Sequence, residues 1–267
     1  MPSRKTKSLK PAEISISDWR EAPDAVAEAH KILEFEPSDT CFYRGQGAVD
    51  WQLLPSLHRA EWRRPRDLDL MGLERSLFWE FKCRSADMHT LPMSDWDHLA
   101  EMQHFGIPTR LLDWTELFGV AVYFALCDLK PDSACDAAVW MLNPGRLNSH
   151  KDSWSTNDVV APEFLAAEYG DYGAMLDRNV IPWKRPIAIY PLQKTSRMRM
   201  QRAWFTVHGS IGKPLDEICP EALVKIVLPA STHDDARRFL EFSGLTESII
   251  FPGIEGLAME LVKKYIK

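Results

Sequence analysis

The chain has 267 residues, of which 45% are hydrophobic and 26% are charged, so it can bury a sizeable core. Its net charge of -6 argues against a general nucleic-acid-binding protein, because such proteins need a concentrated positive face. No apolar run approaches the roughly 18 residues that cross a bilayer, and the basic N-terminal segment lacks the apolar core of a secretory signal. We therefore expect no membrane association and a cytoplasmic location.

The five cysteines are widely spread, with no C-x-x-C pair and no histidine cluster at ligand spacing. This pattern argues against a disulfide framework and against structural zinc. We expect no metal.

The first half of the chain shows mainly helical patterns. Residues 1–14 are expected to form a flexible tail, and Ser17 or Asp18 would cap the helix that follows. Gly106-Ile107-Pro108 is a helix breaker, since the residue before proline avoids the α region. The expected elements are a helix at 15–35, a strand at 41–44, a turn at 45–47, helices at 68–89 and 94–104, and an apolar segment at 109–114.

The second half contains most of the strand candidates. Val120 to Leu126 fits a buried helix or a strand, and Ala121 and Ala125 favour a helix packed on a sheet. The expected elements are strands at 137–142, 187–191, 203–207, 223–228 and 248–251, a turn at 143–145, and helices at 162–169, 232–243 and 256–265. Helices followed by several strands predict an α+β fold, with residues 15–267 as one domain whose helical N-terminal half packs on a mixed or antiparallel sheet.

Arg44 follows two aromatic residues in the stretch Cys41-Phe-Tyr-Arg-Gly-Gln46. One interpretation is an anion clamp, because a guanidinium binds phosphate or carboxylate bidentately and Gly45 lets a ligand approach the backbone. The other is a strand-edge arginine that reaches solvent or pairs with a nearby acid.

The stretch QHFGIPTRLLDWT at 103–115 places Arg110 and Asp113 in otherwise apolar sequence. A buried charge must be paired or used, because leaving water costs several kcal/mol. The two side chains are expected to pair with each other, or to line a cleft together with the hydroxyl of Thr109.

Gln201 precedes an apolar strand, and its amide either satisfies buried backbone groups or contributes to a site. We predict that Arg44, Arg110 and Gln201 converge on one polar cleft, because a shared pocket would satisfy all three groups. No G-x-S-x-G, P-loop or G-x-G-x-x-G motif is present.

Several stretches together resemble the FRG domain family, named for its aromatic-Arg-Gly motif. The matching stretches are FYRGQ at 42–46, WQLLPSLHR at 51–59, QHFGIPTRLLDWT at 103–115, AVYFA at 121–125 and a degenerate R-x-x-x-Q-x-G-x-F around Arg197 and Gln201. In order and spacing they cover about residues 40–255. Ala203 stands where the family tends to have glycine, and Leu117-Phe118 where it tends to have Asn-Pro.

The order of these motifs is similar to that of ADP-ribosyltransferases. The similarity implies an ADP-ribosyltransferase-like fold and an NAD cofactor, with Gln201 and Asp113 in catalytic positions. It also implies a bacterial toxin or phage-defence effector with a protein or nucleic-acid acceptor and an antitoxin or defence partner. The residues that would bind NAD are Arg44, Gly45, Gln46, Thr109 and Arg110. The alternative is a non-catalytic module whose arginines bind a phosphate-bearing ligand or an acidic protein segment.

Overall fold

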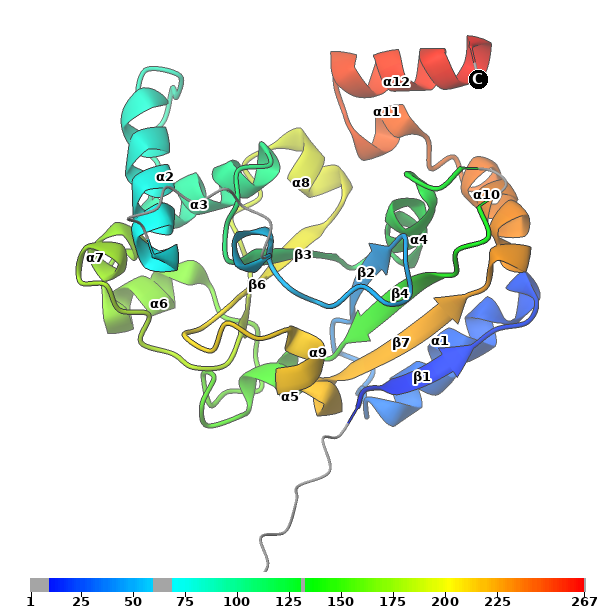
Figure 1. Ribbon diagram of the computed structural model, residues 1–267, viewed down its shortest axis with the longest axis horizontal. Helices are drawn as coiled ribbons and strands as arrows, with labels where there is room; N and C mark the ends of the chain where they lie inside the picture. Colours follow the sequence, from blue (N-terminus) through cyan, green and yellow to red (C-terminus); the bar gives the residue numbers. More distant parts are fainter. Residues whose placement is uncertain (1–9, 60–68, 131–132, 267) are drawn as a thin grey trace, which may run out of the picture. The chain divides into compact units, whose positions relative to one another are not determined.

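The computed structural model describes residues 10–59, 69–130 and 133–266 (Figure 1). The contacts of the chain group into two compact units whose segments alternate along the sequence. The first unit comprises Met1–Gln52, Leu117–Asn143 and Pro214–Lys267, and the second comprises Leu53–Glu116 and Pro144–Lys213. Within the described residues, no helix is both long enough and apolar enough to cross a membrane.

The first unit contains a mixed set of four strands. They lie in the order β1 (Ala12–Ser15), β7 (Leu223–Leu228), β4 (Ala137–Leu142) and β2 (Phe42–Gln46). β1 is parallel to β7, whereas β7 with β4 and β4 with β2 are antiparallel. Because side chains alternate along a strand, every second residue of these strands contributes to the same face.

Helices cover one face of these strands and bury the core of the first unit. Val139 and Ile226 from the strands pack in one cluster with Ala25, Ala121 and Leu240 from the helices. The helical segments are η1 (Trp19–Glu21), α1 (Ala22–Ile32), α4 (Phe118–Leu126), α9 (Leu215–Ile218), η3 (Pro220–Ala222), η4 (Ala230–Thr232), α10 (His233–Phe242), α11 (Glu247–Ile250) and α12 (Ile254–Tyr265).

The second unit contains three antiparallel strands in the order β3 (Leu111–Thr115), β6 (Ala203–Val207) and β5 (Ile187–Ile189). Its core is rich in aromatic rings, among them Phe78, Trp96, Tyr172 and Trp183. The helical segments are η2 (Ser56–His58), α2 (Leu70–Arg84), α3 (Asp95–His104), α5 (Pro144–Asn148), α6 (Pro162–Tyr169), α7 (Tyr172–Asp177) and α8 (Ser196–Met200).

The predicted α+β class is confirmed, as are most of its elements. The segments 137–142, 203–207 and 223–228 are strands with the expected bounds. The ambiguous segment 120–126 is helical, as its alanines favoured. Gly244 ends α10 with a φ of 68°, the left-handed conformation that glycine adopts readily.

Four local predictions are wrong. Residues 12–14 belong to β1 rather than to a flexible tail, because they pair with β7; residues 1–9 of the predicted tail lie outside the described residues. Gly45 lies inside β2 rather than in a turn. Pro144 begins α5, since proline is well tolerated in the first helical turn. Residues 247–250 form α11 and not a strand, because so short an apolar run does not distinguish the two. The single domain expected over 15–267 stays a prediction.

Candidate functional site

Arg44 lies on β2 in a row of side chains that crosses all four strands of the first unit. In register, Arg44 is opposite Trp140, Trp140 is opposite Lys225, and Lys225 is opposite Glu13. The Lys225 ammonium lies 5.1 Å from the centre of the Trp140 ring and 3.1 Å from a Glu13 carboxylate oxygen. Trp140 is buried and Arg44 is half-buried. Lys225 therefore covers the face of the Trp140 ring, and the half-buried Arg44 lies at the β2 end of the row.

Gly45 is required by packing against α4. A Cβ atom at this position would lie 1.9 Å from the carbonyl oxygen of Ala121 and 2.5 Å from the backbone nitrogen of Ala125. The helix therefore occupies the side of the backbone that we expected a ligand to approach. Tyr43 shares this side, with its ring 5.7 Å from that of Phe118, because residues two apart on a strand share a face.

Gln46 makes hydrogen bonds within the first unit at both ends of its amide. Its oxygen accepts a 2.7 Å hydrogen bond from the Trp140 indole N–H, and its nitrogen donates to the Gln52 carbonyl at 3.3 Å. The side chain is buried. These contacts assign Gln46 a structural role in holding Trp140.

Arg110 is buried in the second unit and forms an ion pair with Glu74 of α2. Its Nε donates to a Glu74 carboxylate oxygen at 2.7 Å and to the Tyr172 hydroxyl oxygen at 3.0 Å, and a second nitrogen bonds Glu74 directly. Another nitrogen donates to the carbonyls of His208 and Gly209. Tyr172 in turn donates to Glu74. The cluster joins α2, β3, α7 and the end of β6.

The charge of Arg110 is fixed by its surroundings. Burial by itself lowers the pKa of Arg110, but the Glu74 carboxylate raises it above its usual value, so the guanidinium stays protonated. Burial also raises the pKa of Tyr172, which keeps its phenol neutral. The expected burial of Asp113 against Arg110 is wrong: Asp113 is exposed, and the carboxylate beside Arg110 is that of Glu74.

Thr109 and Asp113 are connected by a relay of hydrogen bonds through Gln103. The Leu111 N–H donates to the Thr109 hydroxyl oxygen at 3.0 Å, and the Thr109 hydroxyl donates to the side-chain amide oxygen of Gln103 at 2.5 Å. The Gln103 amide nitrogen then donates to Asp113 at 2.6 Å. The hydrogen bond to the Thr109 hydroxyl orients that hydroxyl, and the bond from the hydroxyl orients the Gln103 amide. The exposed carboxylate of Asp113 is therefore held in a defined orientation.

Gln201 lies between α8 and β6, two residues before the strand. Its carbonyl accepts a 2.5 Å hydrogen bond from the Thr115 hydroxyl, and Arg202 after it has a φ of 43°. The Thr115 bond ties Gln201 to the end of β3, the strand that carries Asp113. Gln201 and Asp113 thus belong to one unit, with Gln201 just before β6 and Asp113 in the neighbouring strand β3.

The candidate residues therefore divide between the units. Arg44, Gly45 and Gln46 are in the first, and Thr109, Arg110, Asp113 and Gln201 are in the second. A single cleft formed by Arg44, Arg110 and Gln201 stays a prediction, although Arg110 has its polar atoms directed to the Glu74 cluster.

The sequence analysis missed Gln103, Glu74 and Tyr172. Gln103 carried a signal, because it opens the same motif that contains Thr109 and Asp113. Glu74 and Tyr172 are 36 and 62 residues from Arg110 and belong to different helices. Only the tertiary structure brings them to the arginine.

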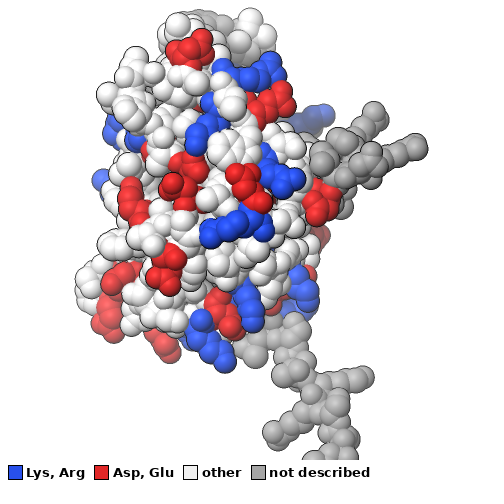
Figure 2. All heavy atoms as spheres, turned by 90° about the vertical axis from the view of Figure 1, so that its left-hand side faces the viewer, with Lys and Arg blue, Asp and Glu red and all other residues white. Residues whose placement is uncertain are grey.

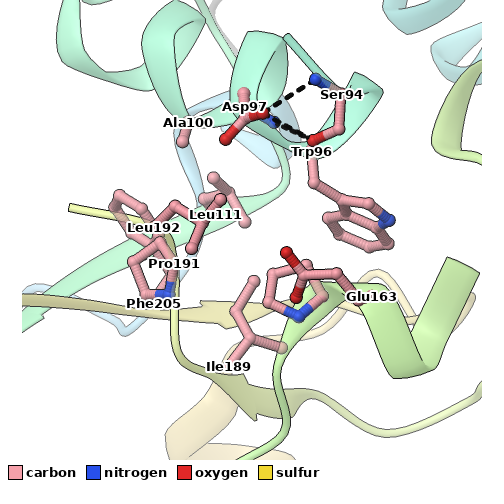
Figure 3. A pocket seen from close by; sticks show the side chains of 11 residues that line it. Ser94, Trp96, Asp97, Ala100, Leu111, Glu163, Ile189, Pro191, Leu192 and Phe205 are labelled. Carbon is pink, nitrogen blue, oxygen red and sulfur yellow. Dashed lines mark hydrogen bonds between the residues drawn. The ribbon is translucent and has the colours of Figure 1, made fainter. Parts of the chain in front are cut away.

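The cavities of the second unit differ greatly in size. Figure 3 shows a cavity beside Asp97 that is lined by both polar and apolar side chains. Its volume of about 10 Å³ leaves room for one water molecule at most. A larger groove of about 240 Å³ lies beside it, where Lys194 bonds Asp97 at 2.7 Å and His89 lies 3.2 Å from Glu101. Met88, Met93 and Met198 form part of its apolar wall.

Charges of both signs are mixed on the face drawn in Figure 2, with no continuous positive stripe. Within residues 10–59, 69–130 and 133–266, no group of three or more His, Cys, Asp and Glu side chains is placed to hold a metal ion. The candidate chemical groups are thus the oriented carboxylate of Asp113 in the second unit and the half-buried side chain of Arg44 in the first.

Comparison with known proteins adds one match. No curated protein and no solved structure matches the chain. The model of one family, described as the FRG domain, matches residues 39–134. The matched segment includes β2 with Arg44, the Thr109–Gln103–Asp113 relay and α4. The chain therefore contains an FRG domain.

Proposed function

We propose that this FRG-domain protein binds NAD and transfers ADP-ribose, with Asp113 as the carboxylate that stabilises the reacting sugar. The observation that carries the proposal is the relay from Thr109 through Gln103, which fixes a solvent-exposed carboxylate in one orientation. An exposed aspartate can be solvated by water and needs no such relay for stability. Orientation of a charged group is what a reaction centre requires.

The reaction breaks the bond between the nicotinamide nitrogen and the ribose carbon. The bonding electron pair leaves with nicotinamide, and the sugar develops positive charge, which the Asp113 carboxylate stabilises electrostatically. A nucleophile on a protein or nucleic-acid acceptor, or water, then bonds the ribose carbon and loses a proton to solvent. Arg44 would hold the pyrophosphate, since its guanidinium can bind two oxygens at once. Gln201 would position the acceptor.

The proposal uses fewer residues than the sequence suggested. Arg110 and Gln46 bond other side chains of their own units, so neither is assigned to NAD. Thr109 would act on the nicotinamide end only through Gln103 and Asp113. The roles proposed for Arg44 and Asp113 are tested separately, because the two residues belong to different units.

A toxin or phage-defence role belongs to the same proposal, because modification of a host protein or nucleic acid would arrest growth. In that case a cell expressing the chain would need an antitoxin or defence partner. The expected result is growth arrest on expression of the wild-type chain and normal growth with Asp113→Asn.

Nicotinamide release from NAD by the purified full-length chain tests the activity. Asp113→Asn should lower the rate by about 100-fold or more, as expected when a group that acts in the transition state is neutralised. Gln103→Ala should lower it by about tenfold, because the carboxylate keeps its charge but loses its fixed orientation. The matched control is Asp158→Asn, an exposed aspartate of the same unit, which should leave the rate unchanged. Equal rates for all three variants would contradict the proposed role of Asp113.

Calorimetry with NAD tests the clamp separately. Arg44→Lys should weaken binding by about tenfold, because lysine keeps the charge but not the planar pair of donors. A wild-type chain that binds neither NAD nor related phosphate ligands at millimolar concentration would contradict the clamp.

The second candidate function is a non-catalytic module that binds a phosphate-bearing ligand or an acidic protein segment. It is favoured by one observation: Arg110, Thr109 and Gln46 are engaged in structural hydrogen bonds. Binding of NAD or a phosphate ligand that depends on Arg44, without nicotinamide release and without an effect of Asp113→Asn, would identify this function.

A further inference from the structure

The groove of about 240 Å³ in the second unit lies between α3, the segment that precedes this helix and the segment that leads into α8. The side chains of Met88, Met93 and Met198 line it. Methionine is flexible and polarisable, so such a wall adapts to apolar ligands of different shape. The usual range for drug-sized ligands starts at about 300 Å³, so this groove fits a smaller molecule.

Helix α3 contributes two carboxylates to the groove, those of Asp97 and Glu101. Residues four apart share one side of a helix, so the two groups lie one turn apart. Among the described residues that line the groove, the only lysine or arginine is Lys194. With a neutral His89, two negative charges and one positive charge leave a net charge of -1. The groove therefore attracts cations.

The Asp97 carboxylate uses one of its two oxygens for the fold. Its Oδ2 accepts hydrogen bonds from the Lys194 ammonium at 2.7 Å, from the Ser94 hydroxyl at 2.8 Å and from the Ser94 N–H at 2.7 Å. In the described parts of the chain, no hydrogen bond reaches Oδ1, which points away from Ser94 in Figure 3. The side chain is only 7% exposed. A buried acceptor needs a donor, so Oδ1 is an open position for a ligand N–H.

The other charged groups of the groove are also loosely bonded. Oε2 of Glu101 lies 3.2 Å from Nε2 of His89, but these buried atoms do not have hydrogen-bond geometry. Lys194 is 40% exposed, and an exposed lysine is held weakly by its ion pair. Burial by itself raises the pKa of Asp97, but the bonds from Lys194 and Ser94 lower it below its usual value. Asp97 is therefore ionised near neutral pH.

We propose that this groove binds a small organic cation, with an ammonium group on an apolar chain. The ammonium donates to Oδ1 of Asp97 and lies beside Glu101, and the chain packs on Met93 and Met198. A hydrogen bond between an ammonium and a carboxylate is stronger than one between neutral groups. An anion is disfavoured, because Lys194 is already paired and both carboxylates repel it. The proposal does not depend on NAD binding, because it uses no residue assigned to NAD.

Titration of the full chain with hexylammonium, hexanol and hexanoate tests the proposal, since these probes share one chain and differ in the head group. At about pH 8 the amine is protonated and the acid is ionised. Methyl signals of isotope-labelled methionine report the binding and its place. Hexylammonium should shift the signals of Met93 and Met198 with a Kd of about 1–10 mM, and the other two probes should bind about tenfold more weakly or less. Met141, in the core of the first unit, should not respond.

Two neighbouring substitutions should change hexylammonium binding in opposite directions. Asp97→Asn should raise the Kd by about tenfold or more, because the acceptor loses its charge. Lys194→Met should lower it by about threefold or more, because it removes the competing cation and leaves the cap of α3 intact. A general loss of structure would weaken binding in both. The matched control is Asp158→Asn, an exposed aspartate of the same unit, which should leave the Kd unchanged.

Three results would overturn the proposal. The first is hexylammonium that gives no saturable shift up to about 50 mM, or that shifts Met141 as much as Met93. The second is hexanol or hexanoate that binds as tightly as hexylammonium, which would make the groove a general apolar site or an anion site. The third is an unchanged Kd in Asp97→Asn, which would mean that water satisfies Oδ1, or a raised Kd in Lys194→Met.

Discussion

The two units use the residues of the FRG match in different ways. In the first unit, Gly45 makes room for α4, and the Gln46 side chain accepts a hydrogen bond from the Trp140 indole N–H. The matched residues of this unit therefore serve close packing. In the second, Arg110 pairs with buried Glu74, and Thr109 and Gln103 orient Asp113, so its motif builds polar networks. The matched segment thus serves packing in one unit and polar networks in the other.

The difference matters for where function is sought. The packing of α4 is sufficient to explain Gly45. The exposed Asp113 carboxylate, by contrast, is oriented by Gln103 and Thr109. Asp113 differs from Gly45 in that it is exposed and accepts a hydrogen bond from the Gln103 side chain.

The largest expected effect is loss of the buried pair in the second unit. Glu74→Ala leaves the Arg110 guanidinium buried without its carboxylate, so the free energy of unfolding should fall by about 3–5 kcal/mol. Chemical denaturation measures this. Glu80→Ala removes the exposed partner of Arg84 on the same helix and should cost about 0.5 kcal/mol or less. Similar costs for the two variants would mean that the second unit does not depend on its buried charges.

The next effect tests packing in the first unit. Gly45→Ala forces β2 and α4 apart, and such overpacking should lower the free energy of unfolding by about 1–3 kcal/mol. Gly47→Ala is the control, since a Cβ there would lie 3.7 Å from its nearest neighbour, an ordinary contact. If both substitutions are tolerated equally, the packing explanation of Gly45 is wrong.

The third prediction compares the stability effects of the buried and the exposed ends of the Thr109–Gln103–Asp113 relay. Thr109→Val leaves the Leu111 N–H and the Gln103 oxygen without their buried partner, which should cost about 1–2 kcal/mol in denaturant unfolding. Asp113→Ala should cost about 1 kcal/mol or less, because its side chain is exposed. A loss for Asp113→Ala above that for Thr109→Val would mean that the Asp113 carboxylate contributes more to stability than its exposure indicates.

The smallest effect is a pH dependence in the second unit. Burial alone raises the pKa of Asp97, but hydrogen bonds from Lys194 and Ser94 lower it below its usual value. Its stabilising contribution is therefore complete above about pH 4 and is lost as the pH falls through the lowered value. Thermal unfolding of Asp97→Asn between about pH 6 and 3 should show a weaker pH dependence than the wild type. An unchanged slope would assign the acid sensitivity to other carboxyl groups.

The sequence by itself determined the class of the fold and most of its elements. The sequence pattern located β4, β6 and β7, and Ala121 with Ala125 favoured a helix on a sheet, because such patterns are local properties of the chain. The sequence also marked Arg110 as a charge that needs a partner. These conclusions required no knowledge of which distant segments meet.

The tertiary structure decided which partner each polar group has. Arg110 meets Glu74 and Tyr172, from helices far along the chain. Asp113 is exposed although its four neighbours in β3 are buried. The same holds for Gly45, whose helix arrives from 76 residues away in the sequence, at Ala121. Long-range contacts depend on how elements assemble, and no local pattern in the sequence encodes that assembly.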